Sequence, residues 1–132
     1  MGAKSFQELV AWQLGDELRN EISVLVKEPE LRTAFALRDQ LDRAADSVCA
    51  NIAEGFRRHT HRQFAHFLDI ASGSLGEIED RLNGVVGKRR VNRDRVEHAL
   101  LLTKRTSVAV ARLRNYLLST PTPKPPKPSD EQ

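Results

Sequence analysis

No proline interrupts the chain between Pro29 and Pro121. Long helices can therefore run through this span, because proline is the residue that most strongly breaks a helix. Apolar residues recur there every three or four positions, which is the spacing of one helix face. One stretch is a clean heptad repeat, formed by Phe64, Leu68, Ala71, Leu75, Ile78, Leu82 and Val85. Aromatic and β-branched residues, which strands favour, are scarce, so we expect an all-α fold.

Local signals bound the first two helices. Ser5 and Glu8 fit a capping box and predict a helix over about 5–27. Pro29 disfavours helical geometry in the residue before it and can open the next helix, over about 30–55. Gly55 suits the left-handed residue that ends many helices. The expected core positions are Phe6, Val10, Leu14, Leu18, Ile22 and Leu25, then Ala34, Leu37, Leu41, Ala44, Ala45, Val48 and Ile52.

The last two helices are bounded in the same way. Thr60 and Gln63 fit a second capping box, which predicts a helix over about 60–86. Asn92 is a suitable cap for a helix over about 92–119. The expected core face of that helix is Val96, Leu100, Thr103, Ser107, Val110 and Leu117.

Four helices of similar length with short connections predict an antiparallel, up-and-down four-helix bundle over residues 1–120. The heptad spacing predicts shallow crossing angles, as in left-handed bundles. Residues 121–132 are rich in proline, and we expect a disordered, solvated tail there.

The sequence lacks features that would indicate a secreted or membrane-bound protein. Cys49 is the only cysteine, so no internal disulfide can form, which suits a reducing cytoplasm. No apolar run approaches the roughly 20 residues of a membrane span, and the N-terminus lacks the apolar stretch of a signal peptide. We therefore expect a cytoplasmic protein that does not associate with a membrane.

Patterns typical of catalysis or of metal binding are missing. A di-metal carboxylate bundle needs Glu three residues before His, and no histidine here meets that spacing. His59, His61 and His66 cluster, but no cysteine or close carboxylate completes a metal site. The serines lack the context of a nucleophile elbow, and Cys49 reads as a packed thiol. We expect no enzymatic activity, no metal and no cofactor.

Charge is distributed unevenly along the chain, whose formal net charge is +3. Residues 1–54 hold six Lys/Arg and ten Asp/Glu, whereas residues 55–132 hold fifteen and eight. Clustered Lys and Arg bind phosphates without reading sequence, although charged groups are usually only solvated helix faces. The candidate nucleic-acid-binding residues are Arg57, Arg58, Arg62, Lys88, Arg89, Arg90, Arg93, Arg95, Lys104, Arg105 and Arg112.

Polar residues flank the core of the second and third helices. Burying one of them without a partner would cost about 1–3 kcal/mol, so we expect a polar network that fixes register within the bundle or between subunits. A ligand site is the alternative. The predicted members of the network are Arg43, Asn51, Glu54, Ser74 and Glu77.

Two features predict contacts beyond the bundle core. Gly73 and Gly76 would let another helix approach the third helix closely. On the fourth helix, Leu101 and Val108 lie off the predicted core side, together with Leu102 and Tyr116. A helix that is apolar on more than one side usually buries against a second partner, so we expect Leu101 and Val108 at a subunit interface.

The segment RAADSVCANIAEGF, residues 43–56, is similar to the signature of small bacterial four-helix bundle proteins encoded by intervening sequences in 23S ribosomal RNA genes. The matching residues are Arg43, Ala44, Ala45, Ser47, Asn51, Ile52, Ala53, Glu54 and Gly55. A second block, residues 63–82, also agrees, as does the opening SFQELVAWQLGDEL. The sequence departs from the family at Gly87–Arg90, where a basic segment replaces an apolar turn.

The resemblance implies an up-and-down bundle that assembles as a ring-shaped homopentamer without enzymatic activity. It also implies a distant likeness to the accessory proteins of diversity-generating retroelements, which are basic pentamers that work with a reverse transcriptase. We therefore expect a homo-oligomeric scaffold that binds RNA or a ribonucleoprotein. The alternative is a protein–protein adaptor, such as a reverse-transcriptase accessory protein.

Overall fold

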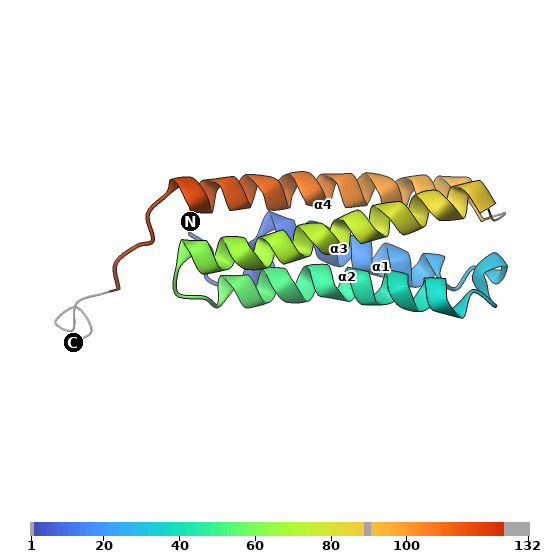
Figure 1. The fold of residues 1–132 in the computed structure, drawn as a ribbon, viewed down its shortest axis with the longest axis horizontal. Helices are drawn as coiled ribbons and strands as arrows, with labels where there is room; N and C mark the ends of the chain where they lie inside the picture. Colours follow the sequence, from blue (N-terminus) through green and yellow to red (C-terminus); the bar gives the residue numbers. More distant parts are fainter. Residues whose placement is uncertain (1, 89–90, 126–132) are drawn as a thin grey trace.

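The structure is a computed structural model that describes residues 2–88 and 91–125. Its four long helices are α1 (Val10–Leu25), α2 (Phe35–Phe56), α3 (His61–Lys88) and α4 (Arg93–Ser119) (Figure 1). Two short 3₁₀ helices, Phe6–Glu8 and Pro29–Leu31, precede α1 and α2. The described residues contain no strand, and the predicted all-α fold is confirmed.

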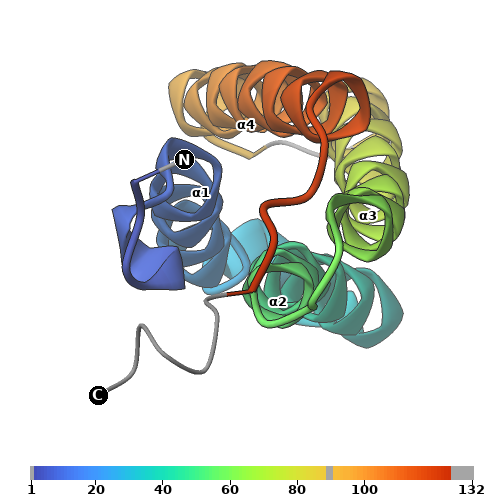
Figure 2. The same cartoon turned by 90° about the vertical axis from the view of Figure 1, so that its left-hand side faces the viewer.

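The four long helices form an antiparallel bundle around one core. Each of α1 and α3 packs against both α2 and α4, and the view along the bundle shows α1 and α3 on opposite sides (Figure 2). This is the predicted up-and-down arrangement; its left-handed coiling stays a prediction. Residues 121–125 leave α4 as an exposed, non-helical segment, and the rest of the predicted tail, residues 126–132, lies outside the described residues.

The heptad repeat of α3 predicted its buried face correctly. All seven of its residues are buried: Phe64, Leu68, Ala71, Leu75, Ile78, Leu82 and Val85. They interlock with buried side chains of the other three helices, among them Leu18, Leu41 and Leu102. Burying side chains of this size stabilises the fold by roughly 1.5–3 kcal/mol each before the entropy of ordering the chain is subtracted.

The core face of α1 differs from the prediction near its start. Val10 is 63% exposed and Leu14 is only half-buried, whereas Ala11 and Gly15 are buried instead. The capping box at Ser5 is present, but it caps the first 3₁₀ helix rather than α1, so α1 begins only at Val10. A Cβ on Gly15 would lie 3.3 Å from a methyl of Val48, so this glycine permits a close approach to α2.

The two ends of α2 also differ from the prediction. Pro29 begins a 3₁₀ helix rather than α2, because the chain must first reverse direction; Leu31 fills the end of the core and is fully buried. At the other end, no glycine of the described residues has a positive φ, so Gly55 is not a left-handed terminator. A Cβ there would lie 2.7 Å from the ring of Phe64. Gly55 therefore lets α2 and α3 meet closely near their shared turn.

The buried face of α4 is wider than predicted. Leu102, which the sequence placed off the core, is fully buried, and Ala99 joins it. Thr103 and Thr106 are also buried; each hydroxyl donates to a backbone carbonyl one turn earlier, at 2.7 Å. These bonds satisfy the two polar groups, so α4 can bury them without the cost of an unpaired hydroxyl.

Candidate nucleic-acid interface

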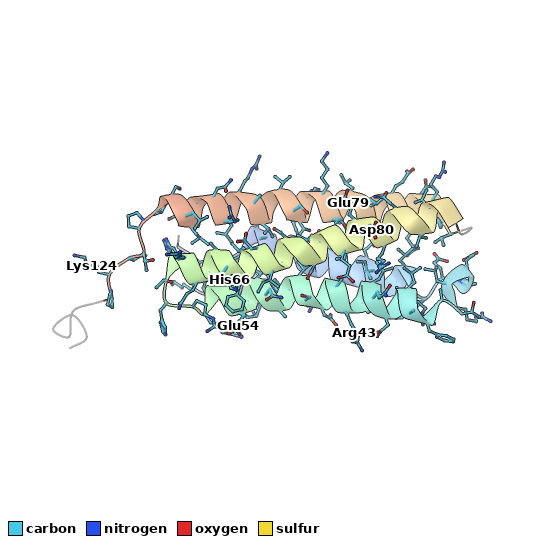
Figure 3. All side chains as sticks on the ribbon, in the orientation of Figure 1. Arg43, Glu54, His66, Glu79, Asp80 and Lys124 are labelled. Carbon is cyan, nitrogen blue, oxygen red and sulfur yellow. The ribbon has the colours of Figure 1, made fainter. Side chains whose placement is uncertain are left out.

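Three arginines and a histidine gather where α2 turns into α3. We call Arg57, Arg58, Arg62 and His66 the turn cluster; they come from the end of α2, the short connection and the first turns of α3. The cluster lies at one end of the bundle, where Figure 3 labels His66 and the neighbouring Glu54. Arg57, Arg58, Arg62 and His66 are all exposed.

Glu54 offsets only part of the charge of the turn cluster. Its carboxylate accepts a hydrogen bond from Arg58 at 2.7 Å and lies 3.9 Å from Arg57. Arg62 forms no ion pair or hydrogen bond with the described part of the chain. No acidic residue occurs between Glu54 and Asp69, and Asp69 is itself paired with Arg114 across α3 and α4. The cluster therefore keeps a surplus of positive charge.

Aromatic rings hold two of the guanidinium groups in place. Arg58 lies over the ring of Phe67 at 4.6 Å, and Arg57 over the ring of Phe6 at 5.5 Å. A hollow of about 350 Å³ lies beside this arrangement, lined by Arg58, Arg62, Gln63, His66 and Phe67. A flat cation stacked on an aromatic ring offers both charge and a surface for a nucleobase. The roles of Phe6 and Phe67 could not be read from the sequence, because the arginines that they contact lie on other turns or helices.

The opposite end of the bundle supports nucleic-acid binding less well. The backbone of Lys88 ends α3, and Arg89 and Arg90 lie outside the described residues. Arg93 is exposed at the start of α4. Arg95 is instead half-buried between two carboxylates: its Nε lies 3.1 Å from Glu28, without a hydrogen bond at that atom, and Nη1 lies 4.0 Å from Glu21. Its charge is thus neutralised within the bundle.

The third basic group lies beside an apolar groove. Lys104, Arg105 and Arg112 are exposed on the outer face of α4 and form no ion pair or hydrogen bond in the described residues. A groove of about 470 Å³ runs between α4 and α1. We call it the α1–α4 groove; it is lined by these three cations and by Val10, Leu14, Leu101, Val108 and Ala109. The sequence predicts Val10 and Leu14 in the core, but Val10 is exposed and Leu14 is half-buried.

Only part of the predicted polar network forms within one chain. Ser47 Oγ accepts from Asn51 Nδ2 at 3.1 Å and from Ser74 Oγ at 2.8 Å, and so joins α2 to α3. The other three predicted members lie elsewhere: Arg43 pairs with Asp39, Glu54 belongs to the turn cluster, and Glu77 is exposed. Contacts of these three between subunits stay a prediction.

All four histidines lie within the described residues. Among the described residues, no three His, Cys, Asp or Glu side chains lie close enough together to hold a metal ion. His61 has a structural role that the sequence did not reveal. Its backbone amide donates to Thr122 Oγ1 at 2.9 Å, and its ring Nδ1 donates to the carbonyl of Thr120 at 2.7 Å. His61 therefore anchors the segment that follows α4.

Cys49 is buried on α2, and burial raises the pKa of its thiol to about 11. We predict that iodoacetamide alkylates Cys49 much more slowly in the folded protein than in urea, because the thiolate is the nucleophile. Since the folded pKa lies above the ordinary value of 9.0, the contribution of the buried thiol to stability should be fully present below pH 9 and should be lost as the pH rises towards 11. Equally fast alkylation of the folded and unfolded protein at pH 8, followed by mass spectrometry, would contradict this.

None of the helices in the described part of the chain combines the length and the apolarity that crossing a bilayer requires.

Comparisons with known proteins agree with this architecture. A family model described as 23S rRNA-intervening sequence protein matches residues 7–110. A crystal structure of a protein of unknown function from the S23 ribosomal protein family of Bacteroides thetaiotaomicron superposes with a TM-score of 0.72. The two chains are 21% identical, and the match covers 80% of this chain and 98% of that one. At this identity the likeness shows the fold alone. No curated protein matches the chain.

Proposed function

The chain belongs to the 23S rRNA-intervening sequence protein family, and from this membership we propose that it is a non-enzymatic, homo-oligomeric scaffold that binds RNA or a ribonucleoprotein. The observation that best supports the proposal is the turn cluster. It combines Arg62, which has no partner in the described residues, with Arg58 stacked on Phe67 beside a hollow.

The turn cluster suits RNA for two physical reasons. Lys and Arg side chains that contact phosphates release bound counterions, which gives strong binding that weakens as salt rises. Unpaired bases of single-stranded RNA stack on aromatic rings and on guanidinium planes, and Arg58 over Phe67 provides such a platform. These contacts read the backbone and the faces of bases, so we expect little sequence specificity.

Assembly would strengthen this binding. We propose a homopentamer, as the resemblance of the sequence implies. In a closed ring each subunit repeats its turn cluster about the axis, so one RNA strand can contact several clusters. Linked sites of this kind raise the overall affinity well above that of one site.

The proposal is tested by titrating the purified protein with labelled single-stranded RNA at 50 mM and 200 mM salt. We expect clear binding at the lower concentration and about 10- to 100-fold weaker binding at the higher one, because a few phosphate contacts are lost to competing cations.

Light scattering with absorbance at 260 and 280 nm reports subunit number and co-purified nucleic acid. A protein that binds no RNA or DNA at low salt, but co-purifies with a specific protein, would favour the adaptor alternative.

A further inference from the structure

The α1–α4 groove is a surface that RNA binding does not explain. Its apolar side chains are unusually open to solvent: Val10 is 63% exposed, Leu101 55% and Val108 41%. They lie beside the cations Lys104, Arg105 and Arg112. Phosphates pair with cations but not with aliphatic side chains, so this combination fits an apolar partner surface that carries carboxylates.

A surface with the matching properties lies on α3 of the same chain. We call it the glycine face; it consists of Gly73, Gly76, Gly84 and Gly87, together with the neighbouring acids Glu77 and Asp80. The four glycines recur at spacings close to one or two helical turns and are all exposed. Figure 3 shows Asp80 along the second half of α3.

The glycines of this face carry a cost that nothing within one chain offsets. A Cβ on any of the four would meet no atom within 4 Å, so no helix of the same subunit approaches them closely, and the helix that the sequence predicts beside Gly73 and Gly76 would have to come from another molecule. Each exposed glycine in a helix destabilises it by about 0.5–1 kcal/mol relative to alanine. That cost is offset if a second molecule packs there closely.

Charge and dimensions match the glycine face to the groove. Glu77 and Asp80 on the glycine face form no ion pair in the described residues. The oppositely charged residues of the groove, Lys104, Arg105 and Arg112, form none either. Leu101 and Val108 lie two turns apart, about 10 Å along α4, and Gly76 and Gly84 lie about 12 Å apart along α3, at 1.5 Å per residue. Two aliphatic side chains of one helix can therefore pack over two glycines of another.

We propose that the α1–α4 groove of one copy receives the glycine face of a second copy. This inference rests on the proposed homo-oligomer and names its contact surfaces. The α1 side and the α3 side of the bundle face away from each other (Figure 2), so the contact is head-to-tail, and repeating it closes a ring or extends a filament. Lys104, Arg105 and Arg112 then pair with carboxylates, which leaves the turn cluster to contact RNA.

The first experiment compares the association of the full chain with that of Gly76→Gln/Gly84→Gln, by sedimentation velocity over a concentration series. Glutamine is a good helix former, and a Cβ at either position meets no atom within 4 Å in the single chain, so helix content by circular dichroism should not fall. We expect at least tenfold weaker association. Ala50→Gln, which introduces the same side chain at an exposed position of α2, should leave association unchanged.

The second experiment exchanges charges. Glu77→Lys/Asp80→Lys should weaken association, and adding Lys104→Glu/Arg105→Glu in the same chain should restore it, which a purely structural role would not do. A wild-type protein that associates while all these variants behave like it overturns the inference and leaves the scaffold intact. A wild-type protein that stays monomeric overturns this inference and the proposed oligomer together, and RNA binding is then judged by its own titration.

Discussion

Reversing the charge of Arg58 and Arg62 together should weaken RNA binding by roughly 100-fold or more at low salt. Each side chain can supply one charge-assisted hydrogen bond to phosphate, worth about 1.5 kcal/mol or more, and tenfold in affinity corresponds to about 1.4 kcal/mol. The variant Arg58→Glu/Arg62→Glu also removes the guanidinium that stacks on Phe67. The slope of log affinity against log salt should become shallower by about 1.4 for single-stranded RNA, since two phosphate contacts are lost.

Arg43→Glu is the control for this variant. Arg43 is an exposed arginine on α2, paired with Asp39, and it lies further along the bundle from the turn cluster (Figure 3). Replacing Arg43 with glutamate changes the net charge by the same amount as each of the two substitutions in the turn cluster. Equal losses of affinity per substituted residue in the two variants would show that binding follows overall charge, and the turn cluster would have no special role.

Replacing Ile78 with alanine should lower the free energy of unfolding by about 2–5 kcal/mol, which is the usual cost of removing a large aliphatic side chain from a packed core. Ile78 is fully buried near the middle of α3 and belongs to the continuous core of the bundle. The cavity left by Ile78→Ala would have to be filled by movements of neighbouring helices, which a close-packed interior resists. Urea unfolding followed by circular dichroism measures the change.

The same substitution two turns earlier in α3 is the control. Ile70 is 41% exposed, so Ile70→Ala leaves no comparable cavity, and we expect a loss of about 1 kcal/mol or less. Both variants are compared at one protein concentration, because association also changes apparent stability. Similar losses for the two variants would contradict the assignment of the core face of α3.

Several local features could be predicted from neighbouring residues alone. Asn92 caps α4 by accepting from the amide of Arg95 at 3.2 Å, and Thr60 accepts from the amide of Gln63 at 3.1 Å. Both interactions join residues three apart, so short sequence patterns encode them. The candidate site was predicted less completely: the arginines of the turn cluster were identified, but their stacking on Phe6 and Phe67 depends on how separate turns and helices meet.

The fold class and the buried face of α3 were determined by the sequence, because the seven apolar residues of the heptad repeat all lie on one face of the helix. Tertiary structure decided which flanking residues the neighbouring helices cover. It buried Leu102, left Val10 in the α1–α4 groove and enclosed Arg95 between Glu21 and Glu28. The spacing of apolar residues specifies where each side chain lies around its own helix axis. Whether a residue at the edge of the apolar face is buried depends on the distance and rotation of the adjacent helix. In this bundle the distance between neighbouring helices is short at Gly15 and Gly55. The lack of a side chain at these two positions could be explained only after the packing of the adjacent helix was known.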